Sequence, residues 1–340
     1  MSHINRRTFL RGAGVTGAVG LTGIAGCLGS ITGGGKTPTI GVAWVVPIEN
    51  FASMMEVPEL QDVLPNLGDK YEFKSIHVSS TPAGVSSMAS GDADLALMTT
   101  VSFAHAIANQ AVPQGITAIA TDFWDAHPDY YGFGVFAKPD SPINGPKDLA
   151  GKKLGVNATG TGIHAVYVKE LDKVGIDPKT GVQFVELEFP AFTQAIKDGR
   201  LDVGIYPALL AGQARAANFK RVFRSQDVFD RGYPFAYNVA ANKSLNKKSK
   251  AMSAWAEDFA FLVDYCRNHR DKALPPAAKH FKFPVAAIEG YFLTNKDYYR
   301  GEVKMDVTAL NGIMKQMVTL GFVDTQRDYG KYVSNKYLPS

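Results

Sequence analysis

The chain has 340 residues, of which 46% are hydrophobic and 20% are charged, so it is globular and long enough for two domains. The formal net charge is +4, and three of these charges are arginines ahead of Cys27, where no acidic residue stands. The remainder is therefore nearly neutral, which argues against nucleic acid as a partner and against an acidic surface.

The first 27 residues have the order of an export signal. Arg6 and Arg7 form a twin-arginine pattern, and the apolar, glycine-rich residues 12–26 that follow are too short and too small to span a membrane. They end at Ile24-Ala25-Gly26-Cys27, which resembles the lipobox of lipoprotein signal peptides. We predict a signal peptide over residues 1–27, lipidation at Cys27 and a flexible tether over residues 28–37. The alternative is an uncleaved anchor with an incidental cysteine.

Short apolar runs then alternate with helical patterns. The predicted helices include residues 83–90, 164–174 and 192–198. The predicted strands are residues 39–44, 72–78, 93–98, 116–122, 133–138, 153–156, 182–187, 202–206 and 235–240. This alternation predicts α/β architecture with parallel sheets covered by helices on both faces.

An internal repeat divides the chain into two similar units. Gly91 and Asp94 precede one predicted strand, and Gly199 and Asp202 precede another with the same spacing. The glycine suits the left-handed end of a helix, and the aspartate stands at the entry to a buried strand. Each copy has a similar start, at residues 40–42 and 154–156. Two units of this kind predict two lobes with a cleft between them.

The lobes are predicted from the points where the chain crosses between the units. Lobe one comprises residues 38–130 and 240–340, lobe two comprises residues 136–234, and the crossings are residues 131–135 and 235–239. Ligands of such sheets bind beyond the carboxyl ends of the strands. Residues 44–50, 99–102, 157–162 and 206–208 follow predicted strands and are therefore candidates for the cleft lining.

Residues 132–143 and 146–156, with the sequences GFGVFAKPDSPI and PKDLAGKKLGV, resemble the hallmark segment of a receptor family. This is the family of aliphatic-sulfonate, taurine, nitrate and thiamine-pyrimidine binding proteins, and the resemblance covers most of residues 38–325. It implies a periplasmic-binding-protein fold of type II, with two doubly wound lobes that close by hinge motion around a small solute. It specifies fold and receptor role more than it specifies the ligand.

The turn over residues 157–162 is the strongest candidate site. A helix start offers free N–H groups and a partial positive charge, which suits a sulfonate or carboxylate. The predicted ligand-binding residues of this turn are Asn157, Thr159, Gly160, Thr161 and Gly162. Thr99 and Thr100 form the matching turn of lobe one. The alternative is a plain helix start with Thr161 as its N-cap.

Aromatic residues near strand ends are further candidates. We predict that Trp44, Trp124 and Tyr206 line the cleft, although each could equally pack in the core or between the lobes. Glu49 and Asp125 could meet a ligand ammonium group, or they could be solvated loop carboxylates.

Enzyme signatures are missing from the sequence. The seven histidines show no metal-ligand spacing, and GxSxG, Walker A and dinucleotide-binding motifs do not occur. We therefore expect no cofactor, no metal and no catalysis, with Cys266 as a buried hydrophobe. One enzyme class, the yeast-type pyrimidine synthases, shares the expected fold but carries a cysteine-rich motif that is absent here. Receptors of TAXI-type TRAP transporters usually have a Gly-Gly-Thr-Tyr turn after the first strand. This sequence has Val-Val-Pro-Ile-Glu there, at residues 45–49, which counts against that class.

The sequence thus predicts a monomeric, extracytoplasmic solute-binding lipoprotein that binds a small organic anion. Its expected partners are the solute, an ABC permease with its ATPase, and the membrane through the lipid anchor. A TAXI-type receptor and a pyrimidine-synthase-like enzyme are the alternatives.

Overall fold

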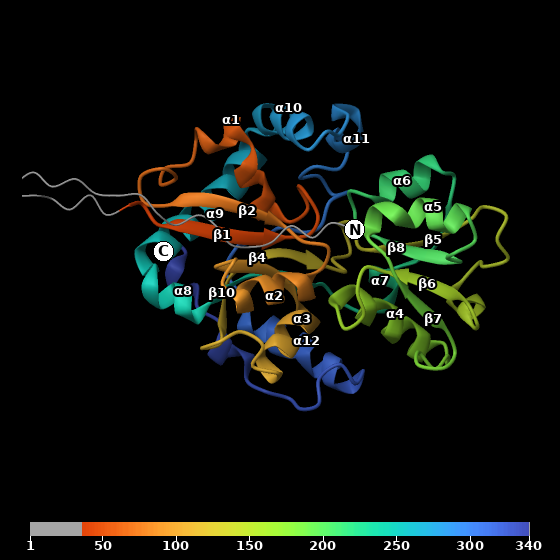
Figure 1. Cartoon of the computed structure of the whole chain (residues 1–340). Helices are drawn as coiled ribbons and strands as arrows, with labels where there is room; N and C mark the ends of the chain where they lie inside the picture. Colours follow the sequence, from red (N-terminus) through yellow and green to blue (C-terminus); the bar gives the residue numbers. More distant parts are fainter. Residues whose placement is uncertain (1–35, 340) are drawn as a thin grey trace, which may run out of the picture. The chain divides into compact units, whose positions relative to one another are not determined.

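The computed structural model describes residues 36–339, which form two five-stranded sheets with helices around them (Figure 1). The predicted signal peptide, Cys27 and nearly all of the predicted tether lie outside the described residues. We call the sheets the β1 sheet, with strand order β2-β1-β3-β10-β4, and the β6 sheet, with order β7-β6-β8-β5-β9.

The strands follow the apolar runs of the sequence. Those of the β1 sheet are β1 (Thr39–Trp44), β2 (Glu72–His77), β3 (Leu95–Thr99), β4 (Ile116–Asp125) and β10 (Tyr233–Ala241). Those of the β6 sheet are β5 (Gly134–Ala137), β6 (Lys153–Val156), β7 (Gln183–Glu186), β8 (Val203–Tyr206) and β9 (Lys220–Arg224).

Both sheets are mixed, which corrects the prediction of parallel sheets. The β10 strand runs antiparallel to β3 and β4, and β5 runs antiparallel to β8 and β9. In each sheet the antiparallel strand is the one that the chain contributes on crossing from the other sheet. It enters without the crossover helix that a parallel neighbour requires. The strand orders of the two sheets therefore correspond position by position.

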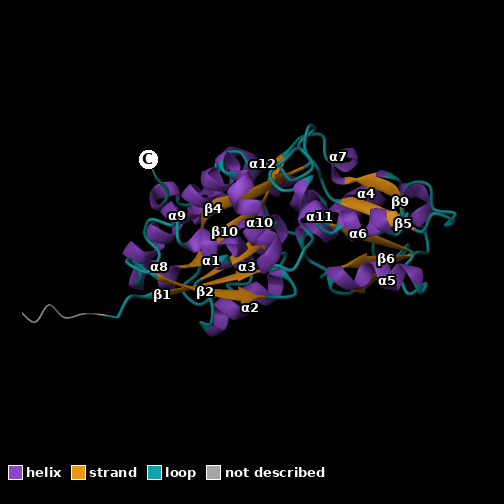
Figure 2. Cartoon of the chain, turned by 90° about the horizontal axis from the view of Figure 1, so that it is seen from above, coloured by secondary structure: helices purple, strands orange, loops and turns teal. Residues whose placement is uncertain are grey.

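Helices lie on both faces of each sheet (Figure 2). Around the β1 sheet these are α1 (Pro58–Gln61), α2 (Thr81–Ser90), α3 (Thr100–Ala108), α8 (Asn242–Lys247), α9 (Ser249–Asn268), α10 (Arg270–His280), α11 (Val285–Glu289) and α12 (Val307–Thr319). Around the β6 sheet they are α4 (Gly162–Lys173), α5 (Phe192–Lys197), α6 (Ala211–Ala216) and α7 (Ser225–Val228). None of the helices in residues 36–339 combines the length and the apolar character that crossing a membrane requires.

The repeated aspartates have the same structural role in both sheets. Asp94 Oδ2 accepts a hydrogen bond of 2.9 Å from Gly41 N, and Asp202 Oδ2 accepts one of 2.7 Å from Lys153 N. Gly91 and Gly199 lie at the ends of α2 and α5 with φ of 88° and 75°. The predicted repeat is confirmed. The hydrogen bonds of the two aspartates, however, make Gly41 and Lys153 the equivalent residues of the two sheets. The similar starts at residues 40–42 and 154–156 are therefore offset by two positions.

The segment after β10 belongs to the β1 sheet. The α9 helix packs on β1, and α12 packs on α3 and β10. Cys266 on α9 is fully buried, as predicted. The predicted crossing at residues 235–239 lies inside β10, where it pairs with β3 and β4. The lobe boundaries themselves stay a prediction.

Candidate functional site

A small cavity lies where the carboxyl ends of the two sheets' parallel strands face each other. The free space inside is about 30 Å³, which holds about two water molecules, so binding of a solute requires the surrounding loops to move apart. Its lining comes from both sheets: Val45, Val46, Glu49, Asn50, Thr81, Leu97, Thr99, Phe123, Phe133, Asn157, Thr161, Ile163, Phe189, Pro207, Phe235 and Ala236.

Three of the predicted residues lie at this cavity. Asn157 and Thr161 line it from the β6 sheet, and Thr99 lines it from the end of β3. Thr161 is the N-cap of α4, and its hydroxyl accepts a hydrogen bond of 3.4 Å from His164 N. Gly162 N donates to Thr99 Oγ1 over 3.0 Å, so the start of α4 contacts the β1 sheet directly.

Three further donors of this turn bind acceptors of the chain itself. Thr159 donates through its N–H and its hydroxyl to Glu186 Oε1, at 2.7 and 2.6 Å, and Gly160 N donates to His164 Nδ1 at 3.1 Å. These hydrogen bonds lower the pKa of Glu186 below its ordinary value. Thr159 and Gly160 lie outside the cavity lining. The turn thus already binds a carboxylate, one that belongs to the protein.

The other predicted residues pack elsewhere. Thr100 Oγ1 donates to the carbonyl oxygens at the start of β10, Tyr206 is buried against Phe136 and Phe192, and Trp124 packs edge-on against Tyr299. Trp44 donates from Nε1 to Glu56 and Ser75. It lines an outer, mostly apolar chamber of about 280 Å³, which shares Val45, Val46 and Phe189 with the cavity.

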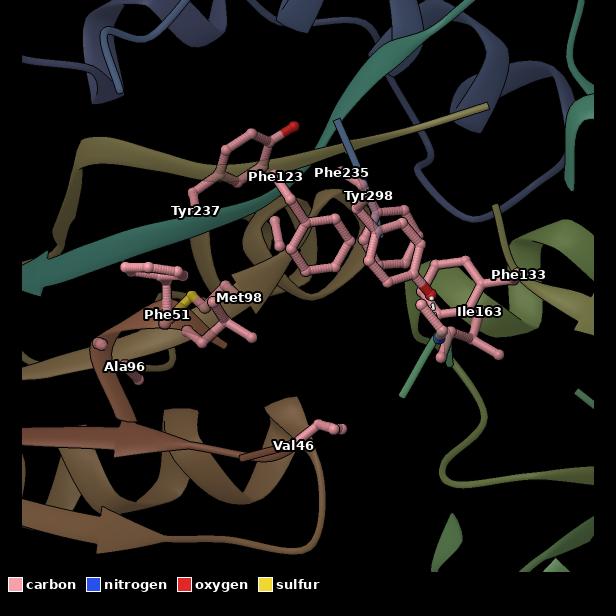
Figure 3. Packing of buried hydrophobic residues seen from close by; sticks show 14 of the residues in the cluster. Val46, Phe51, Ala96, Met98, Phe123, Phe133, Ile163, Phe235, Tyr237 and Tyr298 are labelled. Atoms are coloured by element: carbon pink, nitrogen blue, oxygen red, sulfur yellow. Dashed lines mark hydrogen bonds between the residues drawn. The ribbon is translucent and has the colours of Figure 1, made fainter. Parts of the chain in front are cut away.

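The aromatic lining was not predicted from the sequence. Phe123 of β4 and Phe235 of β10 have ring centroids 5.5 Å apart, and Phe133 lies 4.8 Å from Phe235. Tyr298 stacks on Phe123 at 4.3 Å and completes a group of four rings (Figure 3). Phe123 directly precedes Trp124, and because side chains alternate along a strand, it is Phe123 that points to the cavity.

Glu49 places a buried carboxyl group at the cavity. Its side chain is 2% exposed, Leu209 N donates a hydrogen bond to it, and Oε2 has no partner among the described residues. Asn50 holds this loop in place, since its Oδ1 accepts from Val45 N at 2.8 Å and from Val46 N at 2.7 Å. Asn157 Oδ1 is a second buried oxygen of the lining without a partner in the described part of the chain.

A buried ion cluster lies behind Glu49. Arg300 pairs with Asp122 and Asp297, each at 3.3 Å, and its Nη2 donates to the Glu49 carbonyl oxygen at 2.8 Å. Burial, followed by the negative charge of Asp297, raises the pKa of Glu49 well above its usual range. Burial also raises the pKa of Asp122 to about 7.

Asp125 is not a solvated loop carboxylate. It is fully buried and accepts a hydrogen bond of 2.6 Å from Ser225 Oγ, which ties the end of β4 to α7. Burial raises the pKa of Asp125 to about 6. Within residues 36–339, no group of three or more His, Cys, Asp or Glu could hold a metal ion.

Two family models match the sequence. The model described as "NMT1/THI5 like" matches residues 78–265, and the model of the twin-arginine translocation signal matches residues 3–23. A search of curated proteins finds no match.

Solved structures share the fold at low sequence identity. A ligand-binding component of an ABC-type import system from Staphylococcus aureus, solved with zinc bound, has a TM-score of 0.69 at 13% identity, covering 88% of this chain and 97% of its own. The alkanesulfonate-binding protein SsuA from Xanthomonas axonopodis pv. citri, bound to MOPS, has a TM-score of 0.70 at 12% identity over 87% and 98%. A C27S mutant of the desulfurization enzyme DSZB has a TM-score of 0.62 at 11% identity over 88% and 97%. The predicted periplasmic-binding-protein fold is thereby confirmed.

Proposed function

Because this chain belongs to the NMT1/THI5-like family, we propose that it is the solute-binding protein of an ABC importer and binds a small organic molecule in the cavity between its sheets. The cavity carries the proposal: it is closed by loops from both sheets at the place where this fold class binds ligands. The twin-arginine signal indicates an exported, extracytoplasmic protein, where such a receptor works.

The sequence-based expectation of a small organic anion stays a prediction. Its donors would be the N–H groups and hydroxyls of residues 157–162, and four of these donate to Glu186, His164 and Thr99. Asn157 and Thr161 are the members of that turn that line the cavity. For this reason we propose a small organic solute without restricting it to anions.

A receptor fits the lining better than an enzyme does. The enzyme DSZB has the same fold, but the lining of the cavity offers no cysteine, histidine or serine as nucleophile or base among the described residues. Cys266 is buried on α9, and burial raises the pKa of its thiol to about 12, which disfavours the reactive thiolate.

Lipid anchoring at Cys27 is part of this proposal. Cys27→Ser should move the exported protein from the membrane fraction to the soluble fraction, because the diacyl anchor needs the thiol. Lys in place of both Arg6 and Arg7 should stop export altogether. Membrane association of the Cys27→Ser protein after export would contradict lipidation at this residue.

Binding is tested by thermal unfolding with a solute panel. A solute at about 100 times its Kd should stabilise the native chain by about 2.7 kcal/mol. The panel contains sulfonates, carboxylates, amines, zwitterions such as taurine, and pyrimidines. Stoichiometric binding without conversion of the solute supports the receptor. No stabilisation by any class, or product formation, contradicts it.

A further inference from the structure

We propose that the solute carries an amino group, bound as an ammonium ion by the carboxylate of Glu49 with Asn157 Oδ1 as a second acceptor. This inference rests on the proposed receptor function and names the chemistry that its cavity selects.

The first argument concerns two hydrogen-bond acceptors in the cavity lining. Glu49 Oε2 and Asn157 Oδ1 both belong to cavity-lining residues, both are buried, and neither has a hydrogen-bond partner in the described part of the chain. A buried polar atom without a partner costs about 1–3 kcal/mol, and more when it is charged. A ligand that donates hydrogen bonds removes this cost at both atoms, whereas a ligand oxygen could accept only from a protonated Glu49 and would leave Asn157 Oδ1 without a partner.

The second argument concerns the charged groups around Glu49. The charged groups that act on its carboxyl are Asp297 and Asp122, which repel negative charge, and Arg300, which attracts it. The phenols of Tyr131, Tyr291 and Tyr298 also lie near it. One guanidinium thus faces three carboxyl groups, and Arg300 already pairs with both aspartates. An ionised Glu49 needs a further cation, and a ligand ammonium group supplies it.

The rest of the lining favours a cation over an anion. Among the described residues that line the cavity there is no lysine, arginine or histidine. The ring faces of Phe123, Phe133 and Phe235 attract positive charge and pack against an apolar body.

The proton balance of binding follows from this arrangement. Where Glu49 is protonated in the free protein, its O–H bond breaks and one proton goes to solvent, and the carboxylate then pairs with the ligand R–NH₃⁺. Binding therefore releases up to one proton per site, and affinity for the amine rises with pH until Glu49 is ionised without ligand.

The test compares ligands that share a body and differ in their head group. Calorimetry would measure ligand binding to the full mature chain. One ligand series is 2-phenylethylamine, 2-phenylethanol and 2-phenylethanesulfonate. The second series has the same three head groups on a butyl body. An amine should bind at least about tenfold more tightly than the alcohol and sulfonate of its body. Measurements in two buffers that differ in ionisation enthalpy should show that binding of the amine releases protons to the buffer.

Glu49→Gln is the matched variant, because the amide oxygen can still accept from Leu209 N while the charge is lost. It should abolish the preference for the amine and the proton release. Glu59→Gln, at an exposed position on α1, should retain both.

The outcomes separate this inference from the proposed function. Tighter binding of a sulfonate or an alcohol than of its amine overturns the ammonium proposal and leaves the receptor standing, as does an amine preference that survives in Glu49→Gln. Failure of both amines to bind at about 10 mM overturns the ammonium proposal as well. Failure of the whole solute panel overturns the receptor too.

Discussion

Arg300 keeps two buried carboxylates neutralised. Its guanidinium pairs with Asp122 and Asp297 and lies over the rings of Phe51 and Phe123. Arg300→Leu fills a similar volume but leaves both acids without a counter-charge, so we expect a loss of about 3–5 kcal/mol in the free energy of unfolding. Urea unfolding measures this loss.

Arg231→Leu is the control: it removes an exposed ion pair with Asp230 and should change the free energy of unfolding by less than about 1 kcal/mol. Equal effects of the two substitutions would contradict this role of Arg300.

His164 should make the protein sensitive to acid. Burial lowers the pKa of its ring to about 4, below the ordinary value of 6.5, while Nδ1 accepts from Gly160 N. Between these values the unfolded chain binds more protons than the folded one, so the stability that His164 contributes above pH 6.5 is lost as the pH falls towards 4. Asn at this position can still accept from Gly160 without titrating.

The measurement is the melting temperature of both proteins between pH 7.5 and 4. We expect the wild type to lose more stability than His164→Asn over this interval, because Asp122 and Asp125 titrate in both proteins and cancel in the difference. Parallel pH curves would show that His164 is not buried as a neutral ring.

At the scale of the elements, the start of α4 needs a glycine. A Cβ at Gly162 would lie 2.8 Å from the ring of Phe235 and 3.0 Å from Thr99 Cβ, which forces the helix away from the β1 sheet. We expect Gly162→Ala to weaken binding of the best solute in the panel by at least about tenfold, or 1.4 kcal/mol.

Gly312 provides the control for this substitution. It lies within α12, and nothing is within 4 Å of its added Cβ, so alanine there should stabilise the helix by about 1 kcal/mol and leave affinity unchanged. Unchanged affinity in Gly162→Ala would mean that α4 does not close on the ligand.

Strands that form through local patterns were predictable from the sequence. The apolar runs of β1 and β6 give these two strands to the residue. The β9 strand, at the edge of its sheet, was missed because residues 220–224 contain three basic side chains and only two apolar ones, so they form no continuous apolar run. The antiparallel direction of β5 and β10 was missed because it depends on where the chain returns between sheets, which no local pattern encodes.

The candidate site was predictable in part, because local sequence patterns locate the ends of strands. Strand ends point to the loops that line the cavity, and Thr99, Asn157 and Thr161 lie there. Which face of a strand turns inward is decided by register and twist, so Phe123 lines the cavity and Trp124 does not. The missing counter-charge at the Glu49 carboxyl depends on tertiary contacts of Arg300, about 250 positions away along the chain, which pairs with Asp122 and Asp297 instead.

At the scale of the whole described molecule, three backbone amides join the two sheets across the cavity. Gly162 N donates to Thr99 Oγ1 at 3.0 Å, Ala208 N donates to the Tyr298 hydroxyl at 3.3 Å, and Leu209 N donates to Glu49. All three amides follow strands of the β6 sheet, and all three acceptors are side chains on the other side. Each such bond contributes about 1 kcal/mol, and the hydrogen bonds of Lys169 with Gln316 and of Ser225 with Asp125 also join the two sides, so the amides supply only part of the stability of the closed arrangement.

Solute entry into a cavity closed from both sides requires these three bonds to open, and a bound solute should keep them closed. We therefore predict that saturating solute slows hydrogen exchange in peptides covering residues 158–165 and 207–211, while β2, which lies away from the cavity, exchanges at an unchanged rate. The motion has to be absorbed outside paired strands, at residues 126–133 and 229–232, because β10 is paired along its length with β4. Uniform slowing over the whole chain would indicate general stabilisation, and no slowing in the two peptides would mean that solute binds without closing the sheets on each other.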